Sequence, residues 1–257
     1  MTTERNREFL YGRQPVLETL RAGRRKVFRL AIGVGVRPSP EMKAIRSAAQ
    51  RAGVRVQAIK PGELARLSGG GHHQGVVAEV TPYPYTGLRE ALRGDRATAA
   101  FYLVLDHLQD PQNVGSLLRS AEAAGVTAVF LPARRAAGIT PAAVRVSAGA
   151  SEHLQIVRAG NVAQCLRRLK DERIWVAGLE KAPGSELYTQ RDLTGPLALV
   201  VGSEGRGMKR VVREHCDFLV HLPMAGHVTS LNAGVAGALA MYEVVRQREA
   251  SGAEERS

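Results

Sequence analysis

A glycine-rich loop places one carboxylate where a strand is predicted to end. Residues 197–201 are continuously apolar, which predicts a buried strand, and the loop 202–207 (GSEGRG) follows directly. The carboxylate is Glu204, and Gly202 and Gly207 stand at the ends of the loop. In open α/β sheets, ligands bind beside the carboxyl ends of the strands, so this loop is a candidate ligand site. A loop that only turns the chain, with Glu204 solvated, would contain the same glycines.

A second loop of this kind precedes the last long helix. The apolar run 218–222 predicts another strand, which ends at Pro223. Thr229 and Ser230 can cap the helix that follows, and Asn232 lies two residues beyond Ser230. Two strand ends and a helix N-terminus would then meet around one site. Helix capping alone would also explain Ser230 and Asn232.

An amide and a guanidinium stand in the segment 105–126, LDHLQDPQNVGSLLRSAEAAGV. Asn113 follows Asp-Pro-Gln and can cap a helix over 113–124, and Arg119 lies six residues further along it. An arginine can stabilise developing negative charge or grip a phosphate with two hydrogen bonds. Arg119 can equally be a surface residue paired with Glu122, three residues on.

Several common nucleotide-binding and metal-binding patterns are missing from the sequence. No G-x-G-x-x-G follows the first strand of a βαβ unit, and no G-K-[ST] phosphate loop is present. Cys165 and Cys216 are far apart and form no C-x-x-C pattern. A dinucleotide enzyme, a common Rossmann-type methyltransferase, a nucleotidase and a zinc site are therefore disfavoured, and we expect no metal.

Positive charge is concentrated in the first third of the chain, whose formal net charge is +12 overall. Residues 1–83 carry 15 Lys/Arg against 6 Asp/Glu, whereas the other 174 residues carry 21 against 18. A basic domain beside a nearly neutral one suggests that the first binds a polyanion and the second performs chemistry. A solvated surface in an arginine-rich protein is the alternative.

The periodicity of apolar residues predicts two α/β domains, at 1–83 and 99–250. A linker at 84–98 is punctuated by proline and glycine and has room for a helical turn or two, and 251–257 is a polar tail. In the first domain, helices are expected over 12–22, 40–52 and 61–67, and strands over 26–32, 54–59 and 74–80.

Strands and helices alternate in the second domain, which is typical of a mainly parallel sheet. The expected strands are 101–105, 126–131, 154–157, 174–178, 197–201 and 218–222, and the expected helices include 113–124, 141–148 and 162–172. No apolar run approaches the roughly 20 residues of a membrane span, and the chain does not begin with an apolar signal segment. We therefore expect a cytoplasmic protein without a membrane partner.

The order of these motifs resembles the SpoU family of RNA 2′-O-ribose methyltransferases (TrmH-like, SPOUT class). The segment 105–126 is similar to the first family motif, GSEGRGM to the second and HLPMAGHVTSLNAGVA to the third. The resemblance also includes YGRQPV and HHQGVVAEV and covers nearly the whole chain. It implies methyl transfer from S-adenosylmethionine to a ribose 2′-hydroxyl, with guanosine in 23S rRNA as the target of the most similar branch. The implied partner is RNA and not DNA.

The resemblance also assigns roles to individual residues. Arg119 matches the catalytic arginine, and Asn113, Glu204, Ser230 and Asn232 match the other polar positions. A guanidinium stays protonated in proteins, so we expect Arg119 to orient a phosphate or water that takes the hydroxyl proton. The residues expected to hold the cofactor are Gly202, Gly207, Leu222, Met224, Gly226 and Leu231.

The family fold would join a small domain like the kink-turn-binding ribosomal proteins to a methyltransferase domain with a carboxy-terminal trefoil knot. The family also implies a homodimer. One departure is Ala233-Gly234, where the family commonly has a larger residue followed by Ser or Ala. Gly234 and Gly237 leave one helix face almost without side chains, which suits close approach of the cofactor or of a partner subunit.

Two other functions are compatible with this pattern. One is a tRNA ribose 2′-O-methyltransferase of the same superfamily, but a basic domain placed before the catalytic domain favours rRNA. The other is a non-catalytic RNA-binding protein of ribosome assembly. Such a protein would be expected to have lost Arg119, Glu204 or Asn232, and all three are present.

Overall fold

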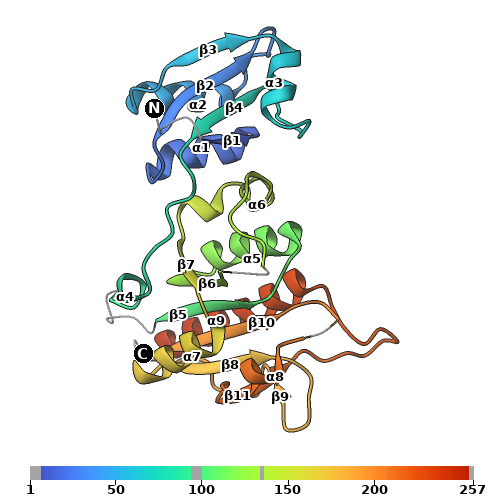
Figure 1. Ribbon diagram of the computed structural model, residues 1–257. Coiled ribbons are helices and arrows are strands. Elements are labelled where there is room, and N and C mark those ends of the chain that lie inside the picture. Colours follow the sequence, from blue (N-terminus) through green and yellow to red (C-terminus); the bar gives the residue numbers. More distant parts are fainter. Residues whose placement is uncertain (1–6, 94–99, 134–135, 206, 255–257) are drawn as a thin grey trace. The chain divides into compact units, whose positions relative to one another are not determined.

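The computed structural model describes residues 7–93, 100–133, 136–205 and 207–254, which form two compact units (Figure 1). The first unit comprises Met1–Pro84 together with Ile139–His153. The second unit comprises Tyr85–Gly138 and Leu154–Ser257. The stretch Ile139–His153 was expected in the other domain.

A four-stranded sheet lies at the centre of the first unit. Its strands are β1 (Glu8–Tyr11), β2 (Val27–Gly33), β3 (Val56–Ile59) and β4 (Val76–Val80), in the order β1-β4-β2-β3. β4 is antiparallel to both its neighbours, and β2 and β3 are parallel. The same part of the chain forms three helices, α1 (Arg13–Ala22), α2 (Pro40–Arg51) and α3 (Pro61–Leu67). Ser39 caps α2 by accepting from the Met42 amide, so this helix begins at its proline.

The stretch Ile139–His153 packs into the first unit through a buried ion pair. It holds α6 (Pro141–Val146), which Thr140 caps, and the 3-10 turn η1 (Ala150–Glu152). Nε and Nη2 of Arg25 donate to the two carboxylate oxygens of Glu152, each at 3.0 Å, and both side chains are fully buried. A two-point ion pair therefore joins residues that are 127 positions apart.

Breaking this ion pair should destabilise the first unit strongly. Glu152→Gln removes the fully buried counter-charge of Arg25 and leaves it only the partly exposed Glu8, and removing one partner of a buried pair costs up to about 3–5 kcal/mol. We expect the free energy of unfolding, measured by urea denaturation, to fall by that amount. Glu41→Gln, which removes the exposed pair with Arg13, should lower it far less, because solvent screens an exposed pair. Equal losses in the two variants would contradict this account.

A parallel sheet forms the second unit. Among the described residues it has seven strands in the order β7-β6-β5-β10-β8-β11-β9, and each neighbouring pair is parallel. The strands are β5 (Phe101–Asp106), β6 (Ala128–Pro132), β7 (Gln155–Ala159), β8 (Trp175–Leu179), β9 (Glu186–Leu187), β10 (Leu197–Gly202) and β11 (Phe218–His221). The predicted fold class, a small α/β domain with a mainly parallel sheet domain, is confirmed; the trefoil knot stays a prediction.

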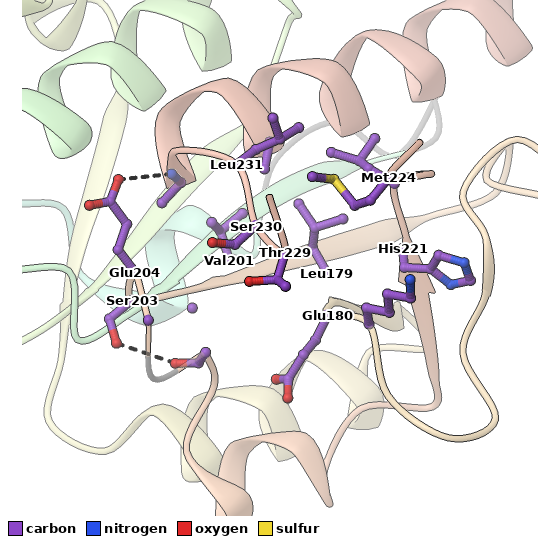
Figure 2. A pocket seen from close by; sticks show the side chains of 17 residues that line it. Leu179, Glu180, Val201, Ser203, Glu204, His221, Met224, Thr229, Ser230 and Leu231 are labelled. Carbon is purple, nitrogen blue, oxygen red and sulfur yellow. Dashed lines mark hydrogen bonds between the residues drawn. The ribbon is translucent and has the colours of Figure 1, made fainter. Parts of the chain in front are cut away.

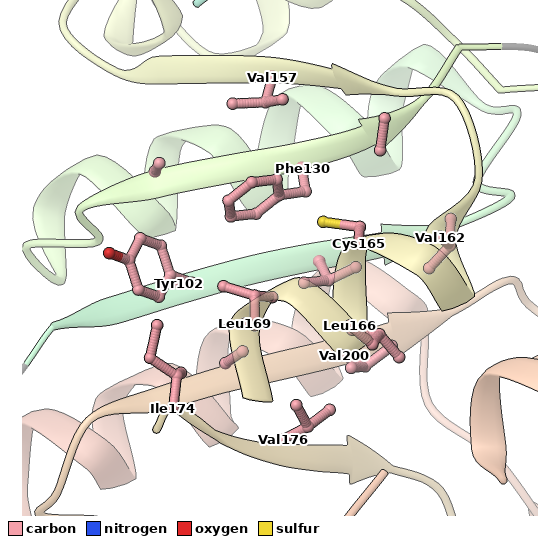
Figure 3. Close-up of a cluster of buried hydrophobic side chains, with 14 of the residues drawn as sticks. Tyr102, Phe130, Val157, Val162, Cys165, Leu166, Leu169, Ile174, Val176 and Val200 are labelled. Atoms are coloured by element: carbon pink, nitrogen blue, oxygen red, sulfur yellow. The ribbon is translucent and has the colours of Figure 1, made fainter. Parts of the chain in front are cut away.

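Helices cover both faces of this sheet. α4 (Leu88–Ala91), α7 (Val162–Asp171) and α8 (Arg210–Arg213) contribute to the hydrophobic cluster on one face. Figure 3 shows Cys165 and Leu166 of α7 beside Phe130 and Val200 of the strands. Burial raises the pKa of Cys165 to about 12, so this thiol acts as an apolar side chain. α5 (Pro111–Ala123) and α9 (Ala233–Glu254) pack together on the other face.

The main differences from the predicted elements lie at helix ends and in short strands. α5 begins at Pro111, because Asp110 and not Asn113 caps it by accepting from the Gln112 amide. α9 begins after Asn232, not after the predicted cap Thr229-Ser230, and continues to Glu254 within the predicted polar tail. β1 and β9 were not predicted. None of the helices in the described residues combines the length and apolar content that crossing a membrane requires.

Candidate functional site

A cavity of about 420 Å³ opens at the carboxyl ends of β8, β10 and β11 (Figure 2). Because β8 lies between β10 and β11 in the sheet, the loops that follow the three strands surround one space. The amino-terminal end of α9 contributes the remaining wall. The lining residues are 179–181, 201–205, 207, 221, 222, 224, 229–231, 233 and 236.

The loop after β10 closes on itself through its backbone. Ser203 N donates to Gly207 O at 3.1 Å, and Gly207 N donates to Ser203 O at 2.9 Å. A Cβ at Gly202 would lie 2.4 Å from the carbonyl carbon of Gly207, so no side chain fits there. Gly207 has a φ of +64°, which other residues rarely adopt. Both glycines are therefore needed for the closure that holds Glu204 between them.

Three polar residues from distant parts of the sequence meet at this site. Asn232 Nδ2 donates to Asn113 Oδ1 at 2.7 Å and to Glu204 Oε1 at 2.6 Å. Its Oδ1 accepts from the Val235 amide at 3.1 Å, which makes Asn232 the cap of α9. Glu204 Oε1 also accepts from the Ala233 amide at 3.1 Å (Figure 2). Asn232 therefore caps α9 and also lies in the junction with Asn113 and Glu204, whereas its role in the reaction stays a prediction.

Arg119 lies on the same helix as Asn113 but is exposed and outside the cavity lining. Within the described part of the chain its guanidinium makes no hydrogen bond or ion pair, so the pairing with Glu122 that the sequence allowed does not form. The structure therefore leaves this cation available to a group outside the chain.

Most of the residues expected to hold a cofactor line the cavity. These are Gly202, Gly207, Leu222, Met224 and Leu231, and the predicted catalytic residue Ser230 joins them. The sixth cofactor candidate, Gly226, is exposed and outside the lining, because the loop after β11 carries it away from the strand ends.

The sequence analysis missed the segment after β8, where Leu179, Glu180 and Lys181 line the cavity. Glu180 Oε2 accepts from the Met208 amide at 3.1 Å, and Oε1 pairs with Arg213 Nη2 at 2.5 Å. The sequence could have indicated this segment. A strand was predicted up to residue 178, and ligands bind beyond the carboxyl ends of such strands.

The glycine face of α9 packs against the same chain. A Cβ at Gly237 would lie 2.4 Å from Leu117 Cδ2 of α5 and 3.3 Å from Val201 Cγ2 of β10. A Cβ at Gly234 would meet Ser116 of α5 at 3.2 Å. The expectation that a cofactor or a partner subunit fills the space at Gly234 and Gly237 is therefore wrong, because α5 fills it, whereas Ala233 and Ala236 of the same helix line the cavity.

Gly237→Leu should consequently destabilise the second unit. A leucine cannot fit against Leu117 without moving α9, and overpacking of this kind costs about 1–3 kcal/mol. We expect a lower midpoint in thermal melts followed by circular dichroism. Ala250→Leu, at an exposed position near the end of the same helix, is the control and should leave the midpoint unchanged. A neutral Gly237→Leu would mean that the two helices are not in close contact.

Comparisons with known proteins relate both units to one group of enzymes. Residues 100–242 match the SpoU rRNA methylase family, and residues 9–86 match the RNA 2′-O ribose methyltransferase substrate-binding family. The 23S rRNA (guanosine-2′-O-)-methyltransferase RlmB of Pseudomonas putida is 48% identical over 70% of this chain and 73% of its own. YacO of Bacillus subtilis, assigned to the TrmH family of tRNA/rRNA methyltransferases, is 40% identical over 95% and 98% of the two chains.

A solved structure supports the same relation. The SpoU methyltransferase AviRb from Streptomyces viridochromogenes, crystallised in complex with the cofactor AdoMet, superposes with a TM-score of 0.80. The two sequences are 27% identical, and the match covers 96% of this chain and 93% of AviRb.

Proposed function

Because the chain belongs to the SpoU rRNA methylase family, we propose that it transfers a methyl group from S-adenosylmethionine to a ribose 2′-hydroxyl of RNA. The proposed target is a guanosine of 23S rRNA. The observation that carries the proposal is the junction of Asn113, Glu204 and Asn232 beside a cavity at three strand ends. These polar residues lie where a ligand of a parallel sheet binds.

The cavity suits S-adenosylmethionine in size and in chemistry. Its volume of about 420 Å³ is within the range of small-molecule sites, roughly 300–1,000 Å³. Leu179, Leu222 and Leu231 offer apolar surface for the adenine ring, and the Glu180 carboxylate can accept hydrogen bonds from hydroxyl or amino groups. When bound, the cofactor supplies a methyl group that its positively charged sulfur already activates, so the proposed reaction needs no metal.

The residues of the chain then have to orient the ribose and manage the hydroxyl proton. Asn232 holds Glu204 through Oε1, and within the described residues Oε2 has no hydrogen-bond donor. We assign to Oε2 the orientation of the ribose hydroxyl or of Arg119. Arg119 would grip a phosphate next to the target and stabilise negative charge on the attacking oxygen. The proton would pass to that phosphate or to a water, since the guanidinium keeps its own.

The target can be identified by comparing 2′-O-methyl sites in rRNA and tRNA from cells with and without the gene. Loss of one guanosine methylation in 23S rRNA would support the proposal, and we then expect the protein in the cytoplasm. Loss of a tRNA methylation would favour the tRNA alternative, to which the names of some relatives also point. Unchanged rRNA and tRNA, with no binding of S-adenosylmethionine in calorimetry, would favour a non-catalytic protein of ribosome assembly.

We also propose that the protein is a homodimer. Val235, Leu239 and Tyr242 of α9 are 49%, 44% and 51% exposed. Their spacing of four and three residues places them on one face of the helix, as an apolar stripe. A two-fold contact would bring the same stripe from two subunits together.

Leu239→Glu should convert the dimer to a monomer, because two buried carboxylates would face each other across the two-fold contact. Sedimentation velocity measures the change directly. Val34→Glu, at an exposed valine of the first unit, should leave the dimer intact. A wild-type protein that sediments as a monomer would contradict the proposal.

A further inference from the structure

The excess positive charge of the second unit is confined to two segments. The unit carries 20 Lys/Arg and 17 Asp/Glu, and the segments 164–173 and 209–217 hold 7 and 4 of these. The rest of the unit holds 13 of each and is neutral. The first segment is most of α7 with the turn after it, and the second is α8 with its flanking residues. The charge is therefore local and not a general property of the surface.

α7 and α8 pack against each other and border a groove of about 420 Å³. We call it the α7–α8 groove. Its lining is entirely polar or charged: Gln164, Arg167, Arg168, Lys170, Asp171, Glu214 and His215. Such a lining suits the phosphates of a nucleic acid better than the apolar core of a protein interface.

Two of the three carboxylates in or beside the groove already have cationic partners, and of the three only Glu214 and Asp171 belong to its lining. Lys170 Nζ pairs with Asp217 at 2.6 Å, and Arg210 Nε pairs with Glu214 at 2.7 Å. The third, Asp171, is exposed on α7. These pairs leave Arg167 and Arg168 against Asp171, so the groove keeps an excess of one positive charge.

Arg167 and Arg168 have few partners of their own. Within the described residues Arg168 makes no ion pair, and Arg167 Nη1 faces His215 Nε2 at 3.4 Å. His215 Nδ1 donates to the Val211 carbonyl at 2.8 Å, so in the neutral ring Nε2 is only an acceptor. A contact of 3.4 Å with an imidazole nitrogen supplies no negative charge, and the guanidinium groups of both arginines remain available to a phosphate.

An ion pair links the groove to the cofactor cavity. Arg213 of α8 pairs with Glu180 at 2.5 Å, and Glu180 lines that cavity. α8 is thus close to both sites, since Arg213 pairs with a residue of the cavity and Glu214 and His215, directly after the helix, line the groove. An RNA strand whose ribose reaches the cavity has phosphates on both sides of that ribose. On one side the backbone can run along α8, so that its phosphates reach the groove.

We propose that the α7–α8 groove binds the backbone phosphates of the RNA strand next to the modified ribose. That the partner is RNA rests on the proposed function. The groove itself belongs to the second unit and not to the basic first domain. Arg167 and Arg168 provide the phosphate contacts, and the sequence of the RNA is not read there.

The salt dependence of RNA binding tests this directly. We expect the full-length Arg167→Gln/Arg168→Gln double variant to bind a fluorescein-labelled single-stranded RNA of mixed sequence more weakly in anisotropy titrations. Each lost phosphate contact lowers the slope of log affinity against log salt by about 0.7 for a single strand. The double variant should therefore lose about 0.7 to 1.4 from the slope, and Arg168→Gln alone about half of that.

Arg89→Gln is the matched control, because Arg89 is an exposed arginine on the surface of helix α4. It should keep the wild-type slope, and the affinity of the double variant for S-adenosylmethionine should be unchanged in calorimetry. Wild-type RNA affinity and slope in the double variant would overturn the proposal. A failure of the proposed function is distinguishable, because it would appear as no methyl transfer to ribosomal RNA by the wild-type protein, whatever the slopes.

Discussion

Replacing Arg119 by alanine should reduce turnover by about 10² or more and leave the affinity for S-adenosylmethionine nearly unchanged. This is the scale of losing one donor that stabilises charge in the transition state. Turnover should fall without a loss of cofactor affinity because of where Arg119 lies. It is exposed on α5 and outside the cavity proposed for the cofactor. Single-turnover methyl transfer and calorimetry measure the two quantities separately.

Two further variants make the result specific. Arg119→Lys should recover only part of the rate, because an ammonium lacks the planar fork that binds a phosphate with two hydrogen bonds. Glu122→Ala, at an exposed position on the same helix, should leave rate and affinity unchanged. An equal loss of cofactor affinity in Arg119→Ala would show that the arginine supports the cavity and has no separate role in the reaction.

Asn232→Asp should reduce turnover at neutral pH by a similar factor of about 10² and respond to acid. The substitution keeps the shape of the side chain but replaces the donor that faces Asn113 and Glu204 with a carboxylate oxygen. Two adjacent carboxylates cannot both ionise easily, so one would take up a proton at a higher pH than an isolated carboxyl does. That proton restores one donor, and activity should rise as the pH falls into this range.

Asn232→Ala is the control for this pH response, because it removes the donor without adding a titratable group. Its turnover should be low and should not recover in acid. The measurement is the pH profile of kcat for the two variants beside the wild type. If both variants keep wild-type activity, the bonds that Asn232 donates to Asn113 and Glu204 have no part in the reaction, and Asn232 serves only as the cap that accepts from the Val235 amide.

The sequence alone determined most of the helices and strands of the two units. The strand 197–201 and the helix 61–67 were expected from short-range patterns, and the structure has them as β10 (Leu197–Gly202) and α3 (Pro61–Leu67). A buried parallel strand needs a continuous apolar run, and a helix start needs a cap or a proline, so both signals lie within a few neighbouring residues. β9 has two residues, too few for any pattern, and it exists because β11 pairs with it.

Candidate residues of the site could also be named from the sequence, because Gly202, Glu204 and Asn232 stand at the ends of predicted elements. Their contacts could not. Asn113 and Asn232 are 119 positions apart, and only the packing of α5 against α9 brings their amides to 2.7 Å. Glu180 joined the site for the same reason, since β8 became the neighbour of β10 only when the sheet assembled.

The division of the chain was likewise decided by tertiary structure. Local patterns place Ile139–His153 among the elements of the methyltransferase sheet, but the Glu152 carboxylate is buried with Arg25 in the first unit. A buried charge is stable only beside its counter-charge, and the sequence does not indicate which of many arginines provides it. The helices and strands thus followed from local sequence patterns. The contacts within the site, the α7–α8 groove and the extent of each unit depend on packing between residues far apart in the sequence.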